Sequence, residues 1–293
     1  MRPTLNVLGC GRLGSTLARL LTATGSVAPG GFFSRSQASA ADARAFVGAG
    51  TVTATLTQLP DADLWLLAVP DGAIGEVAKQ LAGLDRDWHG ITVFHCSGLH
   101  DSSLLAPLAA RGALTASLHP AHSFGDRQKS LESFAGTLCA IEGDSEATAL
   151  LTRVCAPAGA RTIAIPAAAK PLYHAATAAA SNYLVTLVAA SLALLEQAGI
   201  SDANGRALLG PLMSQTAANV LARGPEAALT GPIARGDADT VAQHLAAIAE
   251  QCPQYLSLYR TLGQLTADIV APERSPEDDA LAQIRALLAH QDH

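Results

Sequence analysis

Several patterns that mark other classes of protein are missing from this chain. Its five cysteines are scattered and form no Cys-x-x-Cys pair or Cys/His ligand spacing, which argues against a disulfide framework and a zinc site. We therefore expect reduced thiols in a cytoplasmic protein that holds no metal. The net charge is −6 and no basic stripe is present, so neither nucleic acid nor an anionic membrane is an expected partner.

No targeting segment or low-complexity linker stands out. The first residues lead directly into an apolar strand, which predicts the absence of a signal peptide. Residues 175–195 carry no formal charge and are nearly long enough to span a bilayer, but they are rich in Ala and contain Thr, Ser and Asn. We interpret this stretch as a buried helix of a soluble domain. With 293 residues, 49% of them hydrophobic, the chain is long enough for two globular domains.

The most informative segment lies near the N-terminus, where an apolar strand at Leu5–Leu8 runs into a glycine-rich loop and then a helical pattern. The loop has the Gly-x-Gly-x-x-Gly spacing and comprises Gly9, Cys10, Gly11, Arg12, Leu13 and Gly14. Its first glycine permits a tight turn, the second lets a pyrophosphate approach the backbone, and the third allows close helix packing. The helix N-terminus then faces the phosphates. We predict a dinucleotide site here, the alternative being a purely structural glycine turn.

The residues after the second predicted strand indicate which dinucleotide binds. Ser34, Arg35 and Ser36 follow that strand, about 20 residues beyond the glycines, where an NAD-specific domain places a carboxylate on the adenosine ribose. Hydroxyl groups and a guanidinium suit a 2′-phosphate instead. The pattern therefore favours NADP(H), unless Arg35 is only a solvated loop residue.

Short apolar runs alternate with helical stretches in the first half of the chain, which is typical of a doubly wound parallel sheet. After residue 166 the pattern is helical throughout. We predict an α/β protein with a Rossmann domain at residues 1–166 and an all-helical domain at 167–293. The expected strands are Leu5–Leu8, Gly31–Ser34, Leu64–Val69, Ile91–His95, Leu114–Leu118, Gly136–Ile141 and Arg161–Ile165. The expected helices of the second half cover 168–197, 203–222, 239–251, 254–271 and 277–290, and they are punctuated by prolines, Pro211 among them.

Polar side chains follow three of the predicted strands, at the sheet edge where open α/β folds bind ligands. Val69, Pro70 and Asp71 end the strand that should lie over the cofactor. The next two strands end in His95 with Ser97, and in His119 with His122. Imidazoles and hydroxyls there suit proton transfer to a carbonyl oxygen, although single histidines also cap strand ends.

A second polar cluster begins the first helix of the helical domain. Lys170, His174, Thr177 and Ser181 recur at helical spacing, and Asn182 flanks them, so we expect this stripe to face the cleft. Lys170 is one of only three lysines, and the alternative is a lysine that reaches along the surface to solvent. Further on, Arg235 lies in a Gly- and Pro-rich loop at 229–237, where it would hold a substrate carboxylate or pair with Asp237.

Together these motifs resemble the bacterial family that joins a Rossmann-like NADP domain to a C-terminal helical domain of unknown function, within the 6-phosphogluconate dehydrogenase-like clan. The resemblance rests on the 9–14 loop and the segments Ala68–Asp71, His95–Gly98, Leu118–Pro120 with Ser123–Phe124, Tyr173–Ala176, Ser181–Leu184 and Leu229–Asp237. It implies a 6-phosphogluconate dehydrogenase-like helical domain that forms a homodimer. In the hydroxyacid branch of the clan, a Lys and an Asn one helical turn apart hold the reacting oxygen. Here Lys170 matches the Lys, but His174 stands one turn on and the amide is displaced to Asn182.

The resemblance and the residues lead to one functional hypothesis and two alternatives. We expect an NADP(H)-dependent oxidoreductase that acts on a small 2-oxo or 2-hydroxy acid-like substrate, with ketopantoate as the specific candidate. Lys170 or His119 would handle the proton, Ser97 would bond the reacting oxygen, and His174 with Asn182 would orient the substrate. His95, His122 and Arg235 are further substrate candidates. The alternatives are a dinucleotide-binding regulator without turnover and a deazaflavin-linked NADP reductase.

Overall fold

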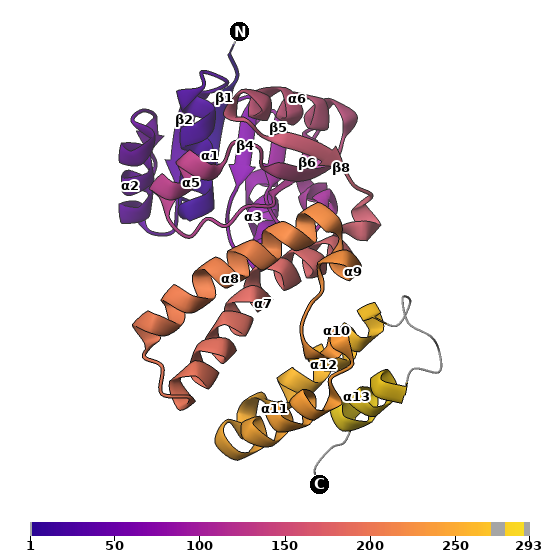
Figure 1. Cartoon of the computed structure of the whole chain (residues 1–293). Coiled ribbons are helices and arrows are strands. Elements are labelled where there is room, and N and C mark those ends of the chain that lie inside the picture. Colours follow the sequence, from indigo (N-terminus) through magenta and orange to yellow (C-terminus); the bar gives the residue numbers. More distant parts are fainter. Residues whose placement is uncertain (1, 271–278, 290–293) are drawn as a thin grey trace. The chain divides into compact units, whose positions relative to one another are not determined.

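The computed structural model describes residues 2–270 and 279–289. The chain forms two compact units, residues 1–181 and 182–293, and the boundary falls inside helix α7 (Lys170–Gln197). The sequence patterns placed the boundary at residue 166, before this helix. The first unit holds the sheet and its covering helices, and the second is helical (Figure 1).

The sheet has eight strands in the order β3-β2-β1-β4-β5-β6-β7-β8. Their bounds are β1 (Thr4–Leu8), β2 (Ala28–Phe33), β3 (Thr51–Val52), β4 (Leu64–Leu67), β5 (Thr92–His95), β6 (Leu114–Pro120), β7 (Leu138–Gly143) and β8 (Arg161–Ala164). Each strand predicted from the sequence is present with shifted ends. Strand β3 was not predicted, because two residues are too few to show an alternating pattern.

The prediction of a parallel sheet is wrong at one position, because β7 runs antiparallel to β6. The connection leaves β6 and enters β7 at the same end of the two strands, where the N–H of Ala121 donates to the carbonyl of Leu138 over 2.9 Å. A connection that does not return to the opposite end of the sheet makes the next strand antiparallel to the one before it. All other neighbouring pairs are parallel.

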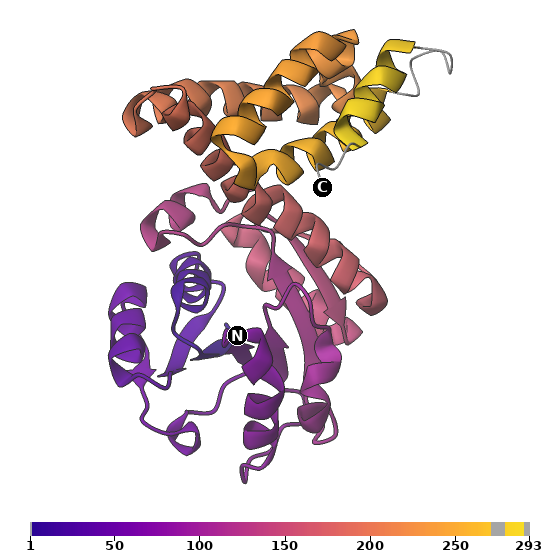
Figure 2. The same ribbon diagram turned by 90° about the horizontal axis from the view of Figure 1, so that it is seen from below.

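Helices cover both faces of the sheet and form two apolar cores (Figures 1 and 2). The alternation of side chains along β4 shows this division: Leu64 and Leu66 belong to one core, and Trp65 and Leu67 to the other. The helices of this unit are α1 (Arg12–Ala23), α2 (Gln37–Val47), α3 (Ile74–Ala82), α4 (Ala106–Ala109), α5 (Arg127–Ser133) and α6 (Ser145–Cys155). Helices α1, α2 and α6 contribute to the first core, and α3 and α4 to the second.

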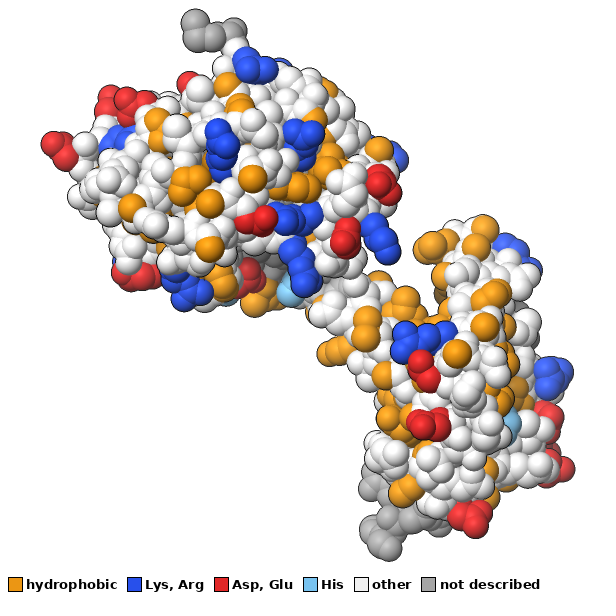
Figure 3. Space-filling view, turned by 90° about the vertical axis from the view of Figure 1, so that its left-hand side faces the viewer, with side chains coloured by type: hydrophobic (Ala, Val, Ile, Leu, Met, Phe, Trp, Pro, Cys, Tyr) orange, Lys and Arg blue, Asp and Glu red, His pale blue; other side chains and the backbone are white. Residues whose placement is uncertain are grey.

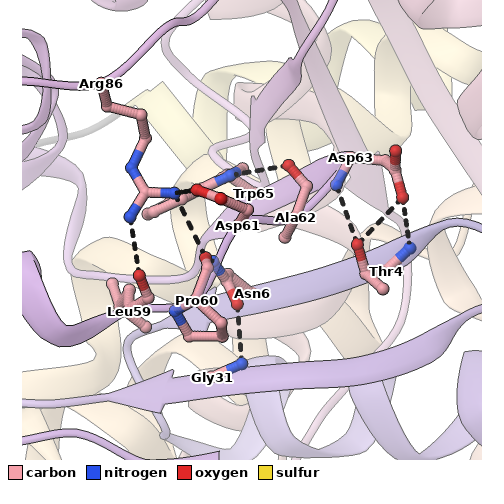
Figure 4. A network of polar contacts seen from close by, with 10 residues as sticks. All are labelled: Thr4, Asn6, Gly31, Leu59, Pro60, Asp61, Ala62, Asp63, Trp65 and Arg86. Carbon is pink, nitrogen blue, oxygen red and sulfur yellow. Dashed lines mark hydrogen bonds and ion pairs between the residues drawn. The ribbon is translucent and has the colours of Figure 1, made fainter.

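Polar contacts fix the loop that leads into β4 (Figure 4). The side chain of Asn6, fully buried on β1, donates to the carbonyl of Pro60 over 2.7 Å and accepts from the N–H of Gly31 over 2.6 Å. The guanidinium of Arg86 donates to the carbonyl of Leu59, pairs with Asp61 and lies over the Trp65 ring. These bonds hold β1, β2 and the start of β4 together, and the opposite ends of these strands form the functional site.

The second unit consists of the later part of α7 with α8 (Asp202–Arg223), α9 (Pro225–Ala228), α10 (Pro232–Arg235), α11 (Ala238–Gln251), α12 (Leu256–Val270) and α13 (Asp279–Ala289). Its core includes Ile233, Val241, Leu245, Ala267 and Ile284. The five helices predicted for this half are present. Residue 271 and residues 277, 278 and 290, at the ends of two predicted helices, lie outside the described residues.

Two prolines of the helical half lie within or at the start of helices. Pro211 lies inside α8, within the helix predicted over 203–222. The segment expected as a loop at 229–237 contains α10, because Pro232 occupies the first helical turn, where no N–H is needed.

The prediction that the long apolar helix is buried is also wrong for the single chain. Tyr183 and Val185 on α7 are 69% and 70% exposed, and among the described residues the helix with its preceding turn, Ala167–Gln197, is long and apolar enough to cross a membrane. Only 6% of the apolar window is buried inside the chain. Its apolar side chains lie all round the helix, so one chain does not cover them.

Candidate dinucleotide-binding and catalytic site

The glycine loop between β1 and α1 is shaped by close backbone contacts. Gly9 has φ of +93°, and a Cβ there would lie 2.3 Å from the carbonyl oxygen of Ala68. A Cβ on Gly14 would lie 2.2 Å from the carbonyl oxygen of Gly9. A Cβ on Gly11, which caps α1, would meet nothing within 4 Å. No protein contact therefore requires glycine at position 11, and the open space in front of it fits an approaching pyrophosphate.

A cavity of about 1040 Å³ lies along this loop, at the carboxyl ends of the strands. It is lined by Gly9 to Leu13, by Ser34, Arg35 and Ser39, by Val69, Pro70 and Asp71, and by Cys96 and Ser97, among others. The volume is that of a ligand pocket, and its place at the carboxyl ends of the strands is where open α/β sheets bind dinucleotides. Of the predicted cofactor residues, only Gly14 and Ser36 do not line it.

The end of the cavity beside β2 carries hydroxyls and one guanidinium. Ser34 and Arg35 line it as predicted, and Arg35 is exposed. Ser36 instead caps α2, accepting a hydrogen bond from the N–H of Ser39 over 3.3 Å. Ser39, which the sequence reasoning missed, takes its place in the lining because it lies one helical turn further on. A serine just before a helical stretch is a typical N-cap, and its hydroxyl bonds the N–H three residues further on. This pattern could have shown from the sequence that the Ser36 hydroxyl is used within the protein.

Ser97 has no free hydrogen-bonding capacity. Its hydroxyl donates to Asp71 Oδ2 over 2.7 Å and accepts from the N–H groups of Leu99 and His100 over 3.2 and 3.0 Å. One donor and two acceptor positions are the full capacity of a serine hydroxyl. Ser97 therefore shapes the turn after β5 and ties it to the start of the helical turn at Asp71.

Lys170 was expected to face the cleft, but it is 1% exposed. Its ammonium donates to the carbonyl of Ser97 over 2.9 Å and to the hydroxyl of Ser117 over 2.5 Å. Burial lowers the pKa of Lys170, while the carboxylates of Glu142, Asp101 and Asp71 raise it in part. The side chain thus fastens the start of α7 to the ends of β5 and β6.

His95 is also fully engaged. It is completely buried, its Nε2 lies 3.0 Å from the carbonyl of Asp101, and its Nδ1 accepts from the N–H of Ser97 over 3.2 Å. Since Nδ1 is an acceptor, Nε2 carries the proton and donates to Asp101. Burial lowers the pKa of His95 to about 4, so the imidazole is neutral at physiological pH.

Three aromatic side chains gather where β6 meets the first turns of α7. His119 Nδ1 lies 2.8 Å from the hydroxyl of Tyr173, and the rings meet edge to face. His174 packs against the same imidazole with ring centroids 6.0 Å apart. A Cβ on Gly98 would lie 2.6 Å from His174 Cδ2 and 2.9 Å from His119 Nε2, so both imidazoles flank this glycine. Gly98 directly follows Ser97, so this cluster adjoins the end of the cavity.

Burial, with a smaller contribution from the ammonium of Lys170, lowers the pKa of His119 to about 4. Burial raises the pKa of the Tyr173 phenol. At neutral pH the pair therefore consists of a neutral imidazole and a protonated phenol. Sequence reasoning missed Tyr173, although it stands between two residues of the polar stripe.

The other predicted residues lie elsewhere. His122 packs against Phe124 and Phe134, with its Nδ1 3.4 Å from the Thr137 hydroxyl. Asn182 and Arg235 belong to the helical unit, where Asn182 is exposed and Arg235 ends α10. The carboxylate of Asp237 caps α11 by accepting from the N–H and hydroxyl of Thr240. Within residues 2–270 and 279–289, no cluster of His, Cys, Asp or Glu could hold a metal ion.

The fold and the site define a Rossmann-type dinucleotide-binding domain followed by a helical domain. A family model described as a Rossmann-like domain matches residues 1–120, and the model of a domain of unknown function, DUF2520, matches residues 137–266. The chain therefore combines these two domains, and the family resemblance seen in its motifs is confirmed.

Solved structures share this architecture over nearly the whole chain. Protein TM1727 from Thermotoga maritima is 27% identical with a TM-score of 0.71, and the match covers 92% of this chain and 100% of that one. BF3122 from Bacteroides fragilis, described as an NADP oxidoreductase, is 21% identical with a TM-score of 0.73 and coverages of 93% and 98%. A reductive aminase from Aspergillus terreus, in complex with NADPH and ethyl levulinate, is 18% identical with a TM-score of 0.65 and coverages of 98% and 99%. A search of curated proteins gives no match.

The strongly lowered pKa values of two buried histidines, His95 and His119, predict how stability depends on pH. His95 and His119 have pKa values of about 4 in the folded chain, against 6.5 ordinarily, so the unfolded chain binds more protons between these values. The free energy of unfolding should therefore fall as the pH falls from 6.5 to 4, by on the order of 1 kcal/mol per unit of pKa difference for each histidine. Urea unfolding across this range measures the slope.

His95→Gln and His119→Gln should each flatten this pH dependence. His89→Gln is the control, because the His89 side chain is 81% exposed and gains little from folding. A slope that is the same in all three variants as in the original chain would contradict the assignment of neutral, buried imidazoles.

Proposed function

We propose that this protein is an NADP(H)-dependent oxidoreductase that acts on a small carbonyl or hydroxy compound. The observation that carries the proposal is the cavity itself. It has a serine- and arginine-lined end suited to a 2′-phosphate, a glycine loop without side chains in its middle, and the His119 cluster beside its other end. Bound NADP(H) would donate or accept a hydride there.

The fold of the solved neighbours supports this proposal. The reductive aminase and an imine reductase from Myxococcus stipitatus were each crystallised with an NADP cofactor, and both match this chain over 98% of its length. Their likeness supports nicotinamide-dependent chemistry on a C=O or C=N bond but names no substrate. We take 2-oxo acid-like compounds, with ketopantoate as the specific candidate, as the first substrates to test.

Within this function, the residues divide into groups that face the substrate and groups that hold the site. His119 is better suited than Lys170 to proton transfer, because the Lys170 ammonium is buried and already donates two hydrogen bonds. We propose that His174 helps to orient the substrate. The substrate roles of Asn182 and Arg235, which belong to the helical unit, stay predictions from the sequence. Ser97 would act by shaping the turn rather than by bonding the reacting oxygen.

Cofactor preference provides the first test. Arg35→Asp should weaken NADPH binding about tenfold or more, because a guanidinium–phosphate hydrogen bond is replaced by repulsion. NADH binding, which involves no 2′-phosphate, should not weaken. Isothermal titration with NADPH, NADP⁺, NADH and NAD⁺ measures this. Equal loss of NADPH and NADH affinity would contradict the role of Arg35, and no binding of any of the four would overturn the oxidoreductase proposal.

Turnover provides the second test. We expect the purified protein to oxidise NADPH with at least one member of a panel of 2-oxo acids, ketones, and ketones mixed with amines. His119→Ala should lower kcat by about 100-fold or more, as expected for loss of an acid–base group. Lys170→Ala should lower activity together with stability. If both variants retain full turnover, the residue assignment is wrong, and a failure of ketopantoate alone removes only that substrate.

Two alternatives are outcomes of the same experiments. NADPH binding without hydride transfer across the whole panel would favour a dinucleotide-binding regulator. Hydride transfer to an oxidised deazaflavin, and to no carbonyl compound, would favour a deazaflavin-linked NADP reductase.

We further propose that the protein is a cytoplasmic homodimer that associates through its helices. Large apolar side chains are exposed along α7, α8 and α12, and Figure 3 shows hydrophobic side chains gathered on the surface of the helical unit. They include Leu172, Tyr183, Leu184, Val185, Leu187, Leu208, Leu212, Leu221, Leu262 and Leu265. A patch of this extent normally marks an interface. A second copy fits better than a bilayer, because Ser181, Asn182, Thr186 and Ser191 interrupt the α7 surface.

Val185→Glu should convert the dimer into a monomer, because the substitution places a charge on a surface that would be buried. Val52→Glu is the control, since Val52 is 41% exposed on an edge strand of the other unit. Sedimentation equilibrium measures the mass. A monomeric original chain would contradict the dimer, and recovery of the chain in the membrane fraction would show that a bilayer covers α7.

A further inference from the structure

We propose that Tyr173 is the group that exchanges the proton with the substrate oxygen, and that His119 holds and polarises its phenol. This inference rests on the proposed oxidoreductase function and deepens it. It differs from the assignments above, in which His119 itself transfers the proton.

The geometry of the pair carries the inference. Tyr173 Oη lies 2.8 Å from His119 Nδ1, and the ring centroids are 5.5 Å apart with the planes at 85°. His119 is held by β6 and Tyr173 by the first turn of α7. Lys170, which precedes Tyr173 on that turn, fastens the helix to the ends of β5 and β6. The phenol is thus held at a fixed point beside the end of the cavity.

The direction of the hydrogen bond decides which group can give up a proton. A neutral imidazole carries one N–H, and His119 Nε2 lies beside Gly98. Among the described residues, His119 forms its hydrogen bond through Nδ1, so we place the proton there, donating to the phenol oxygen. Within the described residues, the Tyr173 hydroxyl makes no other hydrogen bond, and the side chain is only half-buried. Its own proton is therefore available to a ligand.

The environment of the pair keeps the phenol protonated until a ligand takes its proton. Burial and the thiol of Cys139 raise the pKa of Tyr173, so the phenol enters the reduction as an acid that can give its proton to the substrate oxygen. Burial and the ammonium of Lys170 lower the pKa of His119, so the imidazole stays neutral and carries one N–H. The other candidates have no such freedom, because the Lys170 ammonium and the Ser97 hydroxyl are already bonded within the protein.

In reduction, the substrate carbonyl carbon accepts a hydride from the reduced nicotinamide dinucleotide, and its oxygen takes the proton of the Tyr173 hydroxyl. The tyrosinate that remains accepts the His119 Nδ1–H hydrogen bond until it regains a proton from water. Oxidation of the alcohol follows the reverse order, with the tyrosinate as base.

The chain contains a matched pair that serves as a control. In the helical unit, His244 Nδ1 lies 2.7 Å from the hydroxyl of Tyr259, and those ring centroids are 5.9 Å apart at 88°. Tyr259 lines a different cavity, formed by α7, α10 and α12. Tyr173→Phe and Tyr259→Phe therefore remove the same hydroxyl from nearly the same local arrangement at two places.

The test combines kinetics with a measurement on the ligand-free protein. With a carbonyl compound that the original chain reduces, Tyr173→Phe should lower kcat about 100-fold or more and leave the NADPH dissociation constant and the fold unchanged. Tyr259→Phe should leave kcat unchanged. The pH profile should lose the limb caused by ionisation of the phenol in Tyr173→Phe only. Nitrogen NMR of the ligand-free chain should show His119 protonated at Nδ1.

Each outcome decides the inference. Full turnover in Tyr173→Phe, or protonation of His119 at Nε2, overturns it while the oxidoreductase function stands. Equal losses in Tyr173→Phe and Tyr259→Phe also overturn it, because the effect would then be structural. NADPH binding by the original chain without turnover of any carbonyl compound overturns both this inference and the proposed function.

Discussion

The buried ammonium group of Lys170 is the constraint on which the rest of the site depends. Removing an ammonium from water costs several kcal/mol, so it is tolerated only where its hydrogen bonds are satisfied. The carbonyl of Ser97 and the hydroxyl of Ser117 meet this need, and they belong to the ends of two neighbouring strands. Because the lysine stands at the first residue of α7, satisfying its charge also sets where the next turn of that helix lies. Tyr173 and His174 occupy that turn, and their contacts with His119 follow from this attachment.

The polar groups at the strand ends therefore fall into two kinds. Those of Ser97 and His95 are saturated by neighbouring backbone groups and by the carboxylate of Asp71, and they keep this end of the sheet in shape. The Tyr173 hydroxyl has one hydrogen-bond partner among the described residues, His119, and retains unused capacity. A site that must act on a ligand needs both kinds, because a reactive group is useful only when its surroundings cannot rearrange to satisfy it.

The part of the site that local sequence determines was predictable. The glycine loop and Arg35 lie within a short stretch whose spacing fixes the backbone, and they line the cavity as expected. Helical spacing predicted the face of α7 that holds Lys170 and His174 but not the depth of either side chain, because depth depends on contacts with strands far away in the sequence. For the same reason, the direction of β7 and the partner of Tyr173 could not be read from the sequence. The exposure of α7 was mispredicted because an apolar helix looks the same whether its own chain or another molecule covers it.

The antiparallel strand β7 has a consequence for how the site can change. Because β6 ends and β7 begins at the same end of the sheet, the 121–137 connection lies at the end of the strands where His119 is found. A parallel neighbour would have required the chain to cross to the far end and return. Insertions at its exposed positions, such as Gly125, leave the strand register unchanged, whereas the buried Phe134 belongs to the core that α1 also lines. Related chains that differ in substrate would be free to diversify here, while the machinery for the dinucleotide and the proton stays constant.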